Sequence, residues 1–507
     1  MDSFLLYRDS YADGKKSYFS QRDIIKDLNL DILFRTMARE DALISEKVRK
    51  IVMLPLQTPE EILYRQEILQ DFIEHTDVLN EMYDYAMRQH KALRIYKEEM
   101  QKNRTRSTKK TGEIIETVKY LTQGQEELIR LRTLLSRNID ILNSEGLKAL
   151  YERLEALPLK DILDRLHDMD FYTTGGELHY TLQFGGGLKI ENAIFNYCET
   201  NPNRRKKNKQ GTFQNLYLKY VKKNTLFIDN DEVLQQDINH LTEFTALQMI
   251  KVFRPYISKM MSFFDHFIEE ISFYMGAVKF IRRMKELNIP LTTPIPLPAD
   301  SNNTECEDLY ELSMAIYTHN KPVGNDIVLH ENILTLVTGA NQGGKSTFLR
   351  SYGIAQVMMQ CGLPAPAWKF SAPVYKQIFT HFTRREDEQL NSGRLREELQ
   401  RMSSMINAAG PNCLFLLNES FASTTEKEGS RIADGILRAF YEKKITTMMV
   451  THLYQLARKL YDEKLDGISF LVAERKEDGE RTFRMLPGEP SHTSYGADLF
   501  KLLVEDM

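Results

Sequence analysis

Apolar residues recur every three or four positions along most of the first 290 residues, a spacing that predicts amphipathic helices. A helix start lies at Thr58-Pro59-Glu60-Glu61, where the threonine is a preferred N-cap, the proline fits the first turn and the last glutamate can complete a capping box. A second apolar repeat over residues 237–287 predicts a helical arm of roughly 75 Å. Pro255 lies inside this arm and predicts a kink or a break there.

The pattern changes at two places. Residues 171–190 combine several glycines with alternating apolar positions, which predicts a small β element inserted into the helical region. A cluster of prolines at residues 290–298 then predicts a domain boundary. Beyond it, short apolar runs alternate with helical stretches, as in an α/β domain with a largely parallel sheet. The three runs are Asn332–Thr338, Cys413–Leu417 and Thr446–Val450.

These patterns together predict a multidomain chain. We expect a mostly α core and lever region over residues 1–300, with an arm or clamp insertion around residues 100–230 that contains the small β element. An α/β domain is expected over residues 301–507.

Composition narrows the class of protein. With 42% hydrophobic and 27% charged residues, the chain has the balance of a globular protein rather than a disordered one. The net charge of −4 excludes a uniformly basic surface but leaves room for local basic patches. The four cysteines form no C-x-x-C pair, which argues against a zinc ribbon or a disulfide scaffold. With no signal peptide and no apolar run of about 20 residues, we expect a cytoplasmic protein without a membrane partner.

One motif is typical of a phosphate-binding loop. Gly339-Ala340-Asn341-Gln342-Gly343-Gly344-Lys345-Ser346 fits the pattern G-x-x-x-x-G-K-[ST], whose backbone N–H groups converge on phosphate oxygens. Lys345 is expected to reach the β- and γ-phosphates, and Ser346 to hold Mg²⁺. A strand leads into the loop, and the helix that follows from Thr347 turns its positive end toward the anion. We therefore expect ATP and Mg²⁺ as cofactors.

Two strand ends carry candidates for hydrolysis. In P-loop ATPases one strand ends in an acidic pair, in which one residue steadies Mg²⁺ and the next orients the attacking water. Glu419 fits the water-orienting role. Asn418 stands at the metal position, where it can bond to a Mg²⁺-bound water but brings no negative charge. His452 follows another strand and is a candidate sensor of the γ-phosphate, with a purely structural histidine as the alternative.

The ensemble resembles the MutS family of DNA mismatch-repair ATPases. The loop TGANQGGKSTFLR is similar to the family's TGPNMGGKST, with Ala340 and Gln342 as departures. Upstream, Val323-Gly324-Asn325-Asp326 resembles the segment in which the family's asparagine lies near the adenine. LFLLNES resembles the family's acidic strand.

Further motifs follow in the family's order, and the agreement runs from Val323 to Phe500. They are the polar loop Ser423-Thr424-Thr425, the switch Val450-Thr451-His452 and the closing Ser494-Tyr495-Gly496. The resemblance implies an ABC-type P-loop ATPase domain over residues 301–507. More weakly, Leu54-Pro55-Leu56 and the residues after it resemble the start of the family's helical core, and the arm ending near Leu287 resembles its lever.

Three departures shape the expected function. The family's N-terminal mismatch-reading domain has no counterpart here, so we expect a short member that does not read mismatches. Asn418 replaces the family's aspartate, which puts efficient hydrolysis in question. The loop that crosses to the partner's nucleotide, centred on S-T-F and a glutamate in the family, reads Ser392-Gly393-Arg394-Leu395 here.

Family members work as dimers with ATP sites at the interface and helical arms that close on DNA. The resemblance therefore implies a homodimer in which Ser392 or Gly393, at the start of a helix, faces the γ-phosphate bound by the partner.

Nucleic acid has a candidate site in a basic segment. Residues 201–225 contain many lysines and arginines, no acidic residue and several interleaved aromatic residues, a combination suited to phosphates and unpaired bases. The basic core of this segment comprises Arg204, Arg205, Lys206, Lys207 and Lys209. The alternative is an ordinary solvated loop. No spacing indicates base-specific reading, so DNA would be recognised by backbone or shape, and RNA remains open.

The sequence favours a Mg²⁺-dependent, DNA-dependent ATPase whose nucleotide state closes helical arms on branched or looped DNA. Two alternatives stay open. One is a nucleotide-locked clamp or protein scaffold with little hydrolysis, suggested by Asn418. The other is an ATPase whose arms grip a protein rather than nucleic acid.

Overall fold

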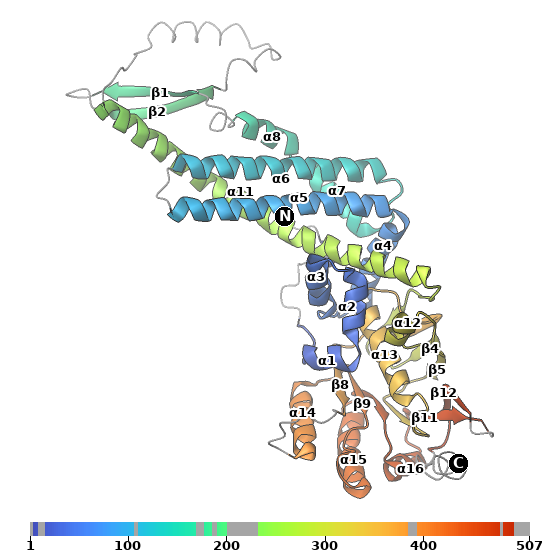
Figure 1. Cartoon of the computed structure of the whole chain (residues 1–507). Coiled ribbons are helices and arrows are strands. Elements are labelled where there is room, and N and C mark those ends of the chain that lie inside the picture. The colour runs from blue at the N-terminus through green and yellow to red at the C-terminus, as the bar shows by residue number, and fades with distance from the viewer. Residues whose placement is uncertain are drawn as a thin grey trace, which may run out of the picture. The chain divides into compact units, whose positions relative to one another are not determined.

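The structure is a computed structural model of the whole chain (Figure 1). It describes residues 4–8, 16–105, 110–168, 177–184, 190–199, 232–383, 393–476 and 480–490. By their internal contacts the residues group into two units. Unit 1 contains mainly residues 80–142 and 147–271, and unit 2 contains residues 4–79, 143–146 and 272–507. The domain boundaries expected from the sequence remain a prediction.

Long helices and one hairpin make up unit 1. The helices are the larger part of α5 (Thr76–Thr105), α6 (Lys110–Asn138), most of α7 (Glu145–Glu155), α8 (Leu159–Asp168) and the first part of α11 (Glu232–Glu286). Stacked rings of Tyr96 and Tyr120, with centroids 5.0 Å apart, join α5 to α6. The antiparallel strands β1 (Glu177–Phe184) and β2 (Ile190–Glu199) form the hairpin, which confirms the predicted β element.

The predicted helical arm is α11, a single helix of 55 residues. It continues through Pro255 and is not divided there. A proline inside a helix costs about 3 kcal/mol because it removes a hydrogen bond and crowds the preceding turn. Ile250 and Ile257, on either side of the proline, are 7% and 8% exposed, and their burial offsets that cost.

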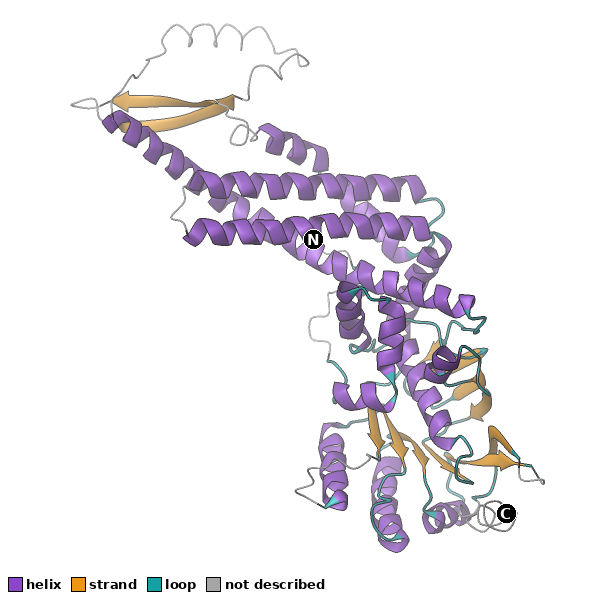
Figure 2. Cartoon of the chain, viewed as in Figure 1, coloured by secondary structure: helices purple, strands orange, loops and turns teal. Residues whose placement is uncertain are grey.

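Unit 2 is built around a six-stranded sheet with strand order β12-β11-β6-β10-β9-β8. All neighbouring pairs are parallel except β11 and β12. The strands are β6 (Leu334–Thr338), β8 (Gln377–Phe382), β9 (Cys413–Asn418), β10 (Thr446–Val450), β11 (Ile468–Arg475) and β12 (Arg481–Pro487). The three strands predicted from the sequence are β6, β9 and β10, and they lie side by side. Figure 2 shows the strands in orange.

Helices cover both faces of this sheet, which explains why the central strands β6, β9 and β10 are almost entirely buried. On one face, Phe415 and Leu417 join a buried cluster with side chains of α14 (Arg394–Ala408), α15 (Glu426–Glu442) and α16 (Tyr454–Glu463). On the other face, Leu416 lies so close to α13 (Lys345–Gln360) that a side chain at Gly353 would meet it at 2.7 Å.

A second sheet and the first helices complete unit 2. The sheet has the order β3-β7-β4-β5 and the strands β3 (Ile295–Leu297), β4 (Thr304–Leu309), β5 (Asn325–Leu329) and β7 (Lys369–Pro373). The short helix α12 (Leu312–Thr318) follows β4. The N-terminal helices are α1 (Gln21–Asp27), α2 (Leu30–Ala38), α3 (Ala42–Val52) and α4 (Pro59–Glu74). Helix α4 begins as predicted, because Thr58 accepts a hydrogen bond from the Glu61 amide and Glu61 accepts one from the Gln57 amide.

A buried arginine joins α4 to the end of α13. The Arg65 side chain is fully buried and donates hydrogen bonds to the carbonyl oxygens of Leu6 and Cys361. Its guanidinium also lies over the rings of Tyr7 and Phe273, 5.1 and 5.4 Å from their centroids. The residues before α4 are thereby fixed to the helix that starts at the phosphate loop.

Within the described residues, no helix is both long enough and apolar enough to cross a membrane.

Candidate functional site

The loop between β6 and α13 has the backbone that a phosphate site requires. Gly339 and Gly344 have φ values of 114° and 90°, which side-chain-bearing residues rarely adopt. At Gly343 there is no room for a side chain, because a Cβ would lie 2.9 Å from the Ala473 methyl. Gly344 is the N-cap of α13, so the positive end of a 16-residue helix faces the loop.

Two side chains from the first turn of α13 are those predicted to bind phosphate and metal. Lys345 is 4% exposed, and its ammonium donates to the carbonyl oxygens of Gly339 and Ala340 at 2.8 and 2.9 Å. Burial lowers the pKa of Lys345, while the charge of Glu419 opposes that shift. Ser346 Oγ donates to Asn418 Oδ1 at 2.8 Å, so the two expected metal residues are in contact.

The strand-end carboxylate and the strand-end imidazole form a pair. His452 Nε2 lies 2.7 Å from Glu419 Oε1. This hydrogen bond is the main reason why the pKa of Glu419 is lowered, against the effect of burial, and the charges of His452 and Lys345 act in the same direction. Glu419 is therefore held as a carboxylate, the form that can accept a proton from or orient a water.

The backbone of Glu419 is fixed in an unusual conformation. Its φ is 54°, in the left-handed region, which a glutamate adopts only where the surroundings hold it. The amide donates to the carbonyl oxygen of Val450 at 2.9 Å, and the carbonyl accepts from Thr383 Oγ1 at 2.9 Å. Both neighbouring strands, β10 and β8, therefore set the direction of the carboxylate.

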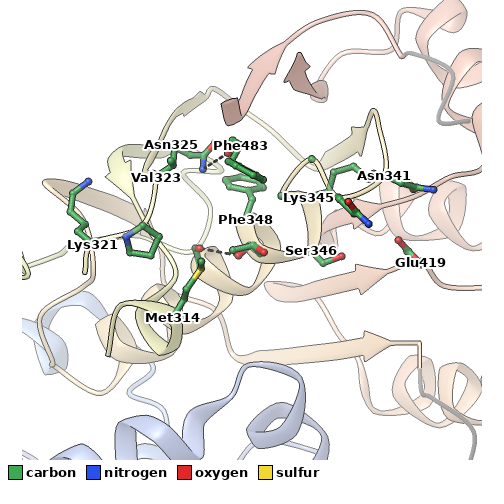
Figure 3. Close-up of a pocket in the computed structure, with 16 residues that line it drawn as sticks. Met314, Lys321, Val323, Asn325, Asn341, Lys345, Ser346, Phe348, Glu419 and Phe483 are labelled. Atoms are coloured by element: carbon green, nitrogen blue, oxygen red, sulfur yellow. Dashed lines mark hydrogen bonds between the residues drawn. The ribbon is translucent and has the colours of Figure 1, made fainter. Parts of the chain in front are cut away.

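These groups border a cavity of about 520 Å³ that is large enough for a nucleotide. It is lined by residues 341–347 and Glu419 at one end and by Lys321, Pro322, Val323 and Met314 at the other. Figure 3 shows Phe348 and Phe483 between the two ends. A polar end with cationic and amide donors, followed by aromatic rings and apolar side chains, suits a phosphorylated ligand with a flat ring.

Asn325 also lines the cavity, and its amide is engaged by β12. Its Oδ1 accepts from the Met485 amide at 2.7 Å, and its Nδ2 donates to the Phe483 carbonyl at 3.5 Å. Asn325 thereby holds Phe483 against the cavity (Figure 3). Phe483 is a site residue that the sequence analysis missed, since no motif marks β12. Phe483 lies two positions after Arg481 on the same strand, so the two side chains belong to one face of β12. The Arg481 guanidinium donates to Gln342 Oε1 of the phosphate loop at 2.7 Å. This two-residue spacing is the sequence signal that could have identified Phe483.

Other predicted site residues lie elsewhere. Gly393 is the N-cap of α14 and is exposed. Ser392, the basic residues Arg204, Arg205, Lys206, Lys207 and Lys209, and the segment Ser494-Tyr495-Gly496 lie outside the described residues. Their predicted roles stay predictions.

The loop, the strand-end pair and the cavity define a P-loop nucleotide-binding domain at the carboxyl edge of a mostly parallel sheet. Residues 335–504 match the family model of MutS domain V, and residues 57–287 match that of the MutS2 N-terminal domain.

The curated relatives that the chain resembles are also MutS proteins. The chain is 31% identical over 192 residues to the DNA mismatch repair protein MutS of Petrotoga mobilis, and 32% identical over 180 residues to that of Thermus aquaticus. It is 27% identical over 185 residues to the MutS protein of Solibacter usitatus. Each alignment covers 35–36% of this chain and 21–22% of the relative. The chain belongs to the MutS family. It spans less than a quarter of the length of these relatives.

Proposed function

We propose that the chain is a Mg²⁺-dependent ATPase that works as a homodimer and closes helical arms on branched or looped DNA. Two contacts beside one cavity carry the proposal: Asn418 with Ser346, and Glu419 with His452. Ser346 and Glu419 line that cavity. Membership of the family supports ATP as the ligand. The names of the curated relatives support a role on DNA.

In this proposal each residue has one role in the reaction. The loop amides and Lys345 bind the phosphates, and residues 339–347 with Asn325 form the ATP site. Ser346 and Asn418 would hold Mg²⁺, which when bound neutralises developing charge on the phosphate oxygens. Glu419 orients the attacking water. His452 is hydrogen-bonded to the Glu419 carboxylate and exchanges this partner for the γ-phosphate when ATP is bound.

Assembly and DNA binding rest on residues outside the phosphate loop. Gly393, with Ser392 before it, presents the N-terminus of α14 for the nucleotide of the partner protomer. The basic residues 204–209 contact the phosphodiester backbone without reading bases.

Phosphate release from Mg²⁺-ATP, measured with branched DNA, linear DNA and no DNA, tests this function. We expect branched DNA to stimulate turnover, and Glu419→Gln to lower kcat by roughly a hundredfold or more while ATP still binds. The exposed Glu442→Gln on α15 is the matched control and keeps parental turnover. Turnover that is unchanged in Glu419→Gln would refute the catalytic role. DNA binding that does not change with salt or on neutralisation of residues 204–209 would refute the contact by these residues. A lack of DNA binding would favour a protein in the arms.

Asn418 favours a second candidate, a nucleotide-locked clamp that hydrolyses ATP poorly. Its amide oxygen contacts Ser346 but supplies no charge for a metal ion. Tight ATP binding without phosphate release by the parent chain, together with release by Asn418→Asp, would support the clamp. Rapid release by the parent chain would exclude it.

A further inference from the structure

A carboxylate interrupts the buried face of α14. Glu398 is 8% exposed, and it lies on the same face as Leu395, Met402 and Met405, which pack into the apolar cluster beneath the helix. An apolar residue is the ordinary occupant of such a position, since burying a carboxyl group costs free energy unless it is fully bonded. The position therefore calls for an explanation in terms of its partners.

The partners of Glu398 belong to the turn that follows Glu419. Glu398 Oε2 accepts a hydrogen bond from the Phe421 amide at 3.1 Å and another from Ser423 Oγ at 3.0 Å. The Phe421 side chain is 1% exposed, and Glu398 supplies the acceptor that a buried amide needs. Burial raises the pKa of Glu398, while the bonds from Ser423 and Phe421 oppose this shift.

This turn has little freedom to vary if Glu419 is to stay in place. Glu419 and Phe421 both have positive φ values, 54° and 66°. Such backbone persists only when its surroundings over-determine it. On the β8 side, Ser420 Oγ is 2.7 Å from His381 Nδ1, and the His381 ring is stacked on Phe421. On the α14 side, Glu398 holds the turn through its hydrogen bonds with the Phe421 amide and Ser423 Oγ.

We propose that Glu398 is a positioning residue for ATP hydrolysis: it holds the turn from Phe421 to Ser423 and thereby the direction of the Glu419 carboxylate. This inference rests on the proposed ATPase function. Gly393, the N-cap of helix α14, lies five residues before Glu398. A shift of that helix start, such as contact with a partner's nucleotide would produce, reaches the catalytic carboxylate through Glu398.

Three variants separate this role from a general loss of stability. Glu398→Ala removes the oxygen that accepts both bonds, whereas Glu398→Gln keeps an oxygen that can accept both bonds. Gln400→Ala, an exposed residue on the same helix, is the matched control. We expect Glu398→Ala to lower kcat by roughly ten- to a hundredfold, because small misplacements of a reacting group have effects of this size. ATP affinity, measured by calorimetry, is expected to stay within about twofold, since no phosphate contact is lost.

The conservative variant and a double variant complete the test. Glu398→Gln is expected to restore kcat to within about threefold of the parent, as its neutral oxygen still accepts both bonds. If Glu398 acts through Glu419, adding Glu398→Ala to Glu419→Gln lowers kcat no further, which is the non-additivity of coupled residues. Should Glu398→Ala fail to fold, Ser423→Ala removes one of the two bonds and is expected to give a smaller loss in kcat at unchanged affinity.

The outcomes distinguish this inference from the proposed function. A parent chain that does not hydrolyse ATP refutes the proposed ATPase and the inference with it. A parent chain that hydrolyses ATP, with parental kcat in Glu398→Ala or Ser423→Ala, overturns the inference alone. So does a loss in Glu398→Gln equal to that in Glu398→Ala, or an additive loss in the double variant.

Discussion

The imidazole of His452 and the carboxylate of Glu419 are hydrogen-bonded at 2.7 Å, although the two residues follow different strands of the sheet. The parallel pairing of β9 with β10 brings both strand ends to one edge. The fold thus places Glu419, a potential general base, beside His452, whose hydrogen bond keeps the carboxylate ionised.

The pair predicts how stability depends on pH. Because its folded-state pKa is lowered, Glu419 contributes stability that is fully present above the unfolded pKa of about 4.3 and is lost as the pH falls through the folded pKa. The parent chain should therefore be more stable than His452→Ala at about pH 5.5, and the difference should narrow toward about pH 3. Urea unfolding across this range measures it, with the exposed His330→Ala as control. A difference that widens on acidification would contradict the prediction.

The Mg²⁺ dependence of phosphate release should change when a negative charge is introduced at residue 418. In Asn418→Asp a carboxylate replaces the amide that contacts Ser346 Oγ. We expect the Mg²⁺ concentration for half-maximal phosphate release to fall by roughly tenfold, equivalent to about 1.4 kcal/mol. A titration with Mg²⁺ at fixed ATP measures this, and Asn320→Asp in an exposed loop should leave the midpoint unchanged. A higher midpoint in Asn418→Asp would argue against a metal at this position.

Phe483 should matter for the base and not for the phosphates. Stacking of a base on an aromatic ring contributes about 1–3 kcal/mol, so Phe483→Ala should weaken ATP binding by roughly fivefold to a hundredfold. Binding of inorganic triphosphate, which has no ring, should not change. Calorimetry with both ligands makes the comparison, and Leu486→Ala, an exposed residue on the same strand, is the control. Equal losses for the two ligands would show that Phe483 supports the loop instead.

Arg65 should be a main determinant of the stability of unit 2. Arg65→Met leaves the buried carbonyl oxygens of Leu6 and Cys361 without these donors, and each unsatisfied group costs about 1–3 kcal/mol. We expect the free energy of unfolding to fall by at least about 2 kcal/mol. Arg39→Ala, which removes an exposed ion pair with Glu286, should cost less than about 1 kcal/mol. Denaturant unfolding of both variants tests the difference, and equal losses would contradict it.

Local patterns explain which elements the sequence could predict. The start of α4 at Thr58, the three central strands and the phosphate loop are each encoded by adjacent residues, so a short window of sequence suffices. The small β element was predicted for the same reason. The helix through Pro255 was less predictable, because the apolar contacts that maintain it come from other parts of the chain.

The site was predictable where chemistry resides in a motif and not where it depends on pairing across the fold. Lys345, Ser346 and Glu419 come from such motifs. Phe483 and Glu398 do not, since an isolated phenylalanine is ordinarily a core residue and a glutamate on a helix is ordinarily a surface residue. Their positions follow only from the packing of β12 beside β5 and of α14 beneath the turn after β9.

The anchoring of α13 by Arg65 has a consequence for the order in which the chain is completed on the ribosome. Arg65 and its partner Cys361 are 296 residues apart, a delay on the order of 15–60 s at about 5–20 residues per second. The segments of unit 1 lie almost entirely between these two residues. Unit 1 is therefore fully synthesised while Arg65 of α4 still lacks its partner Cys361. The proposed nucleotide site forms late in synthesis.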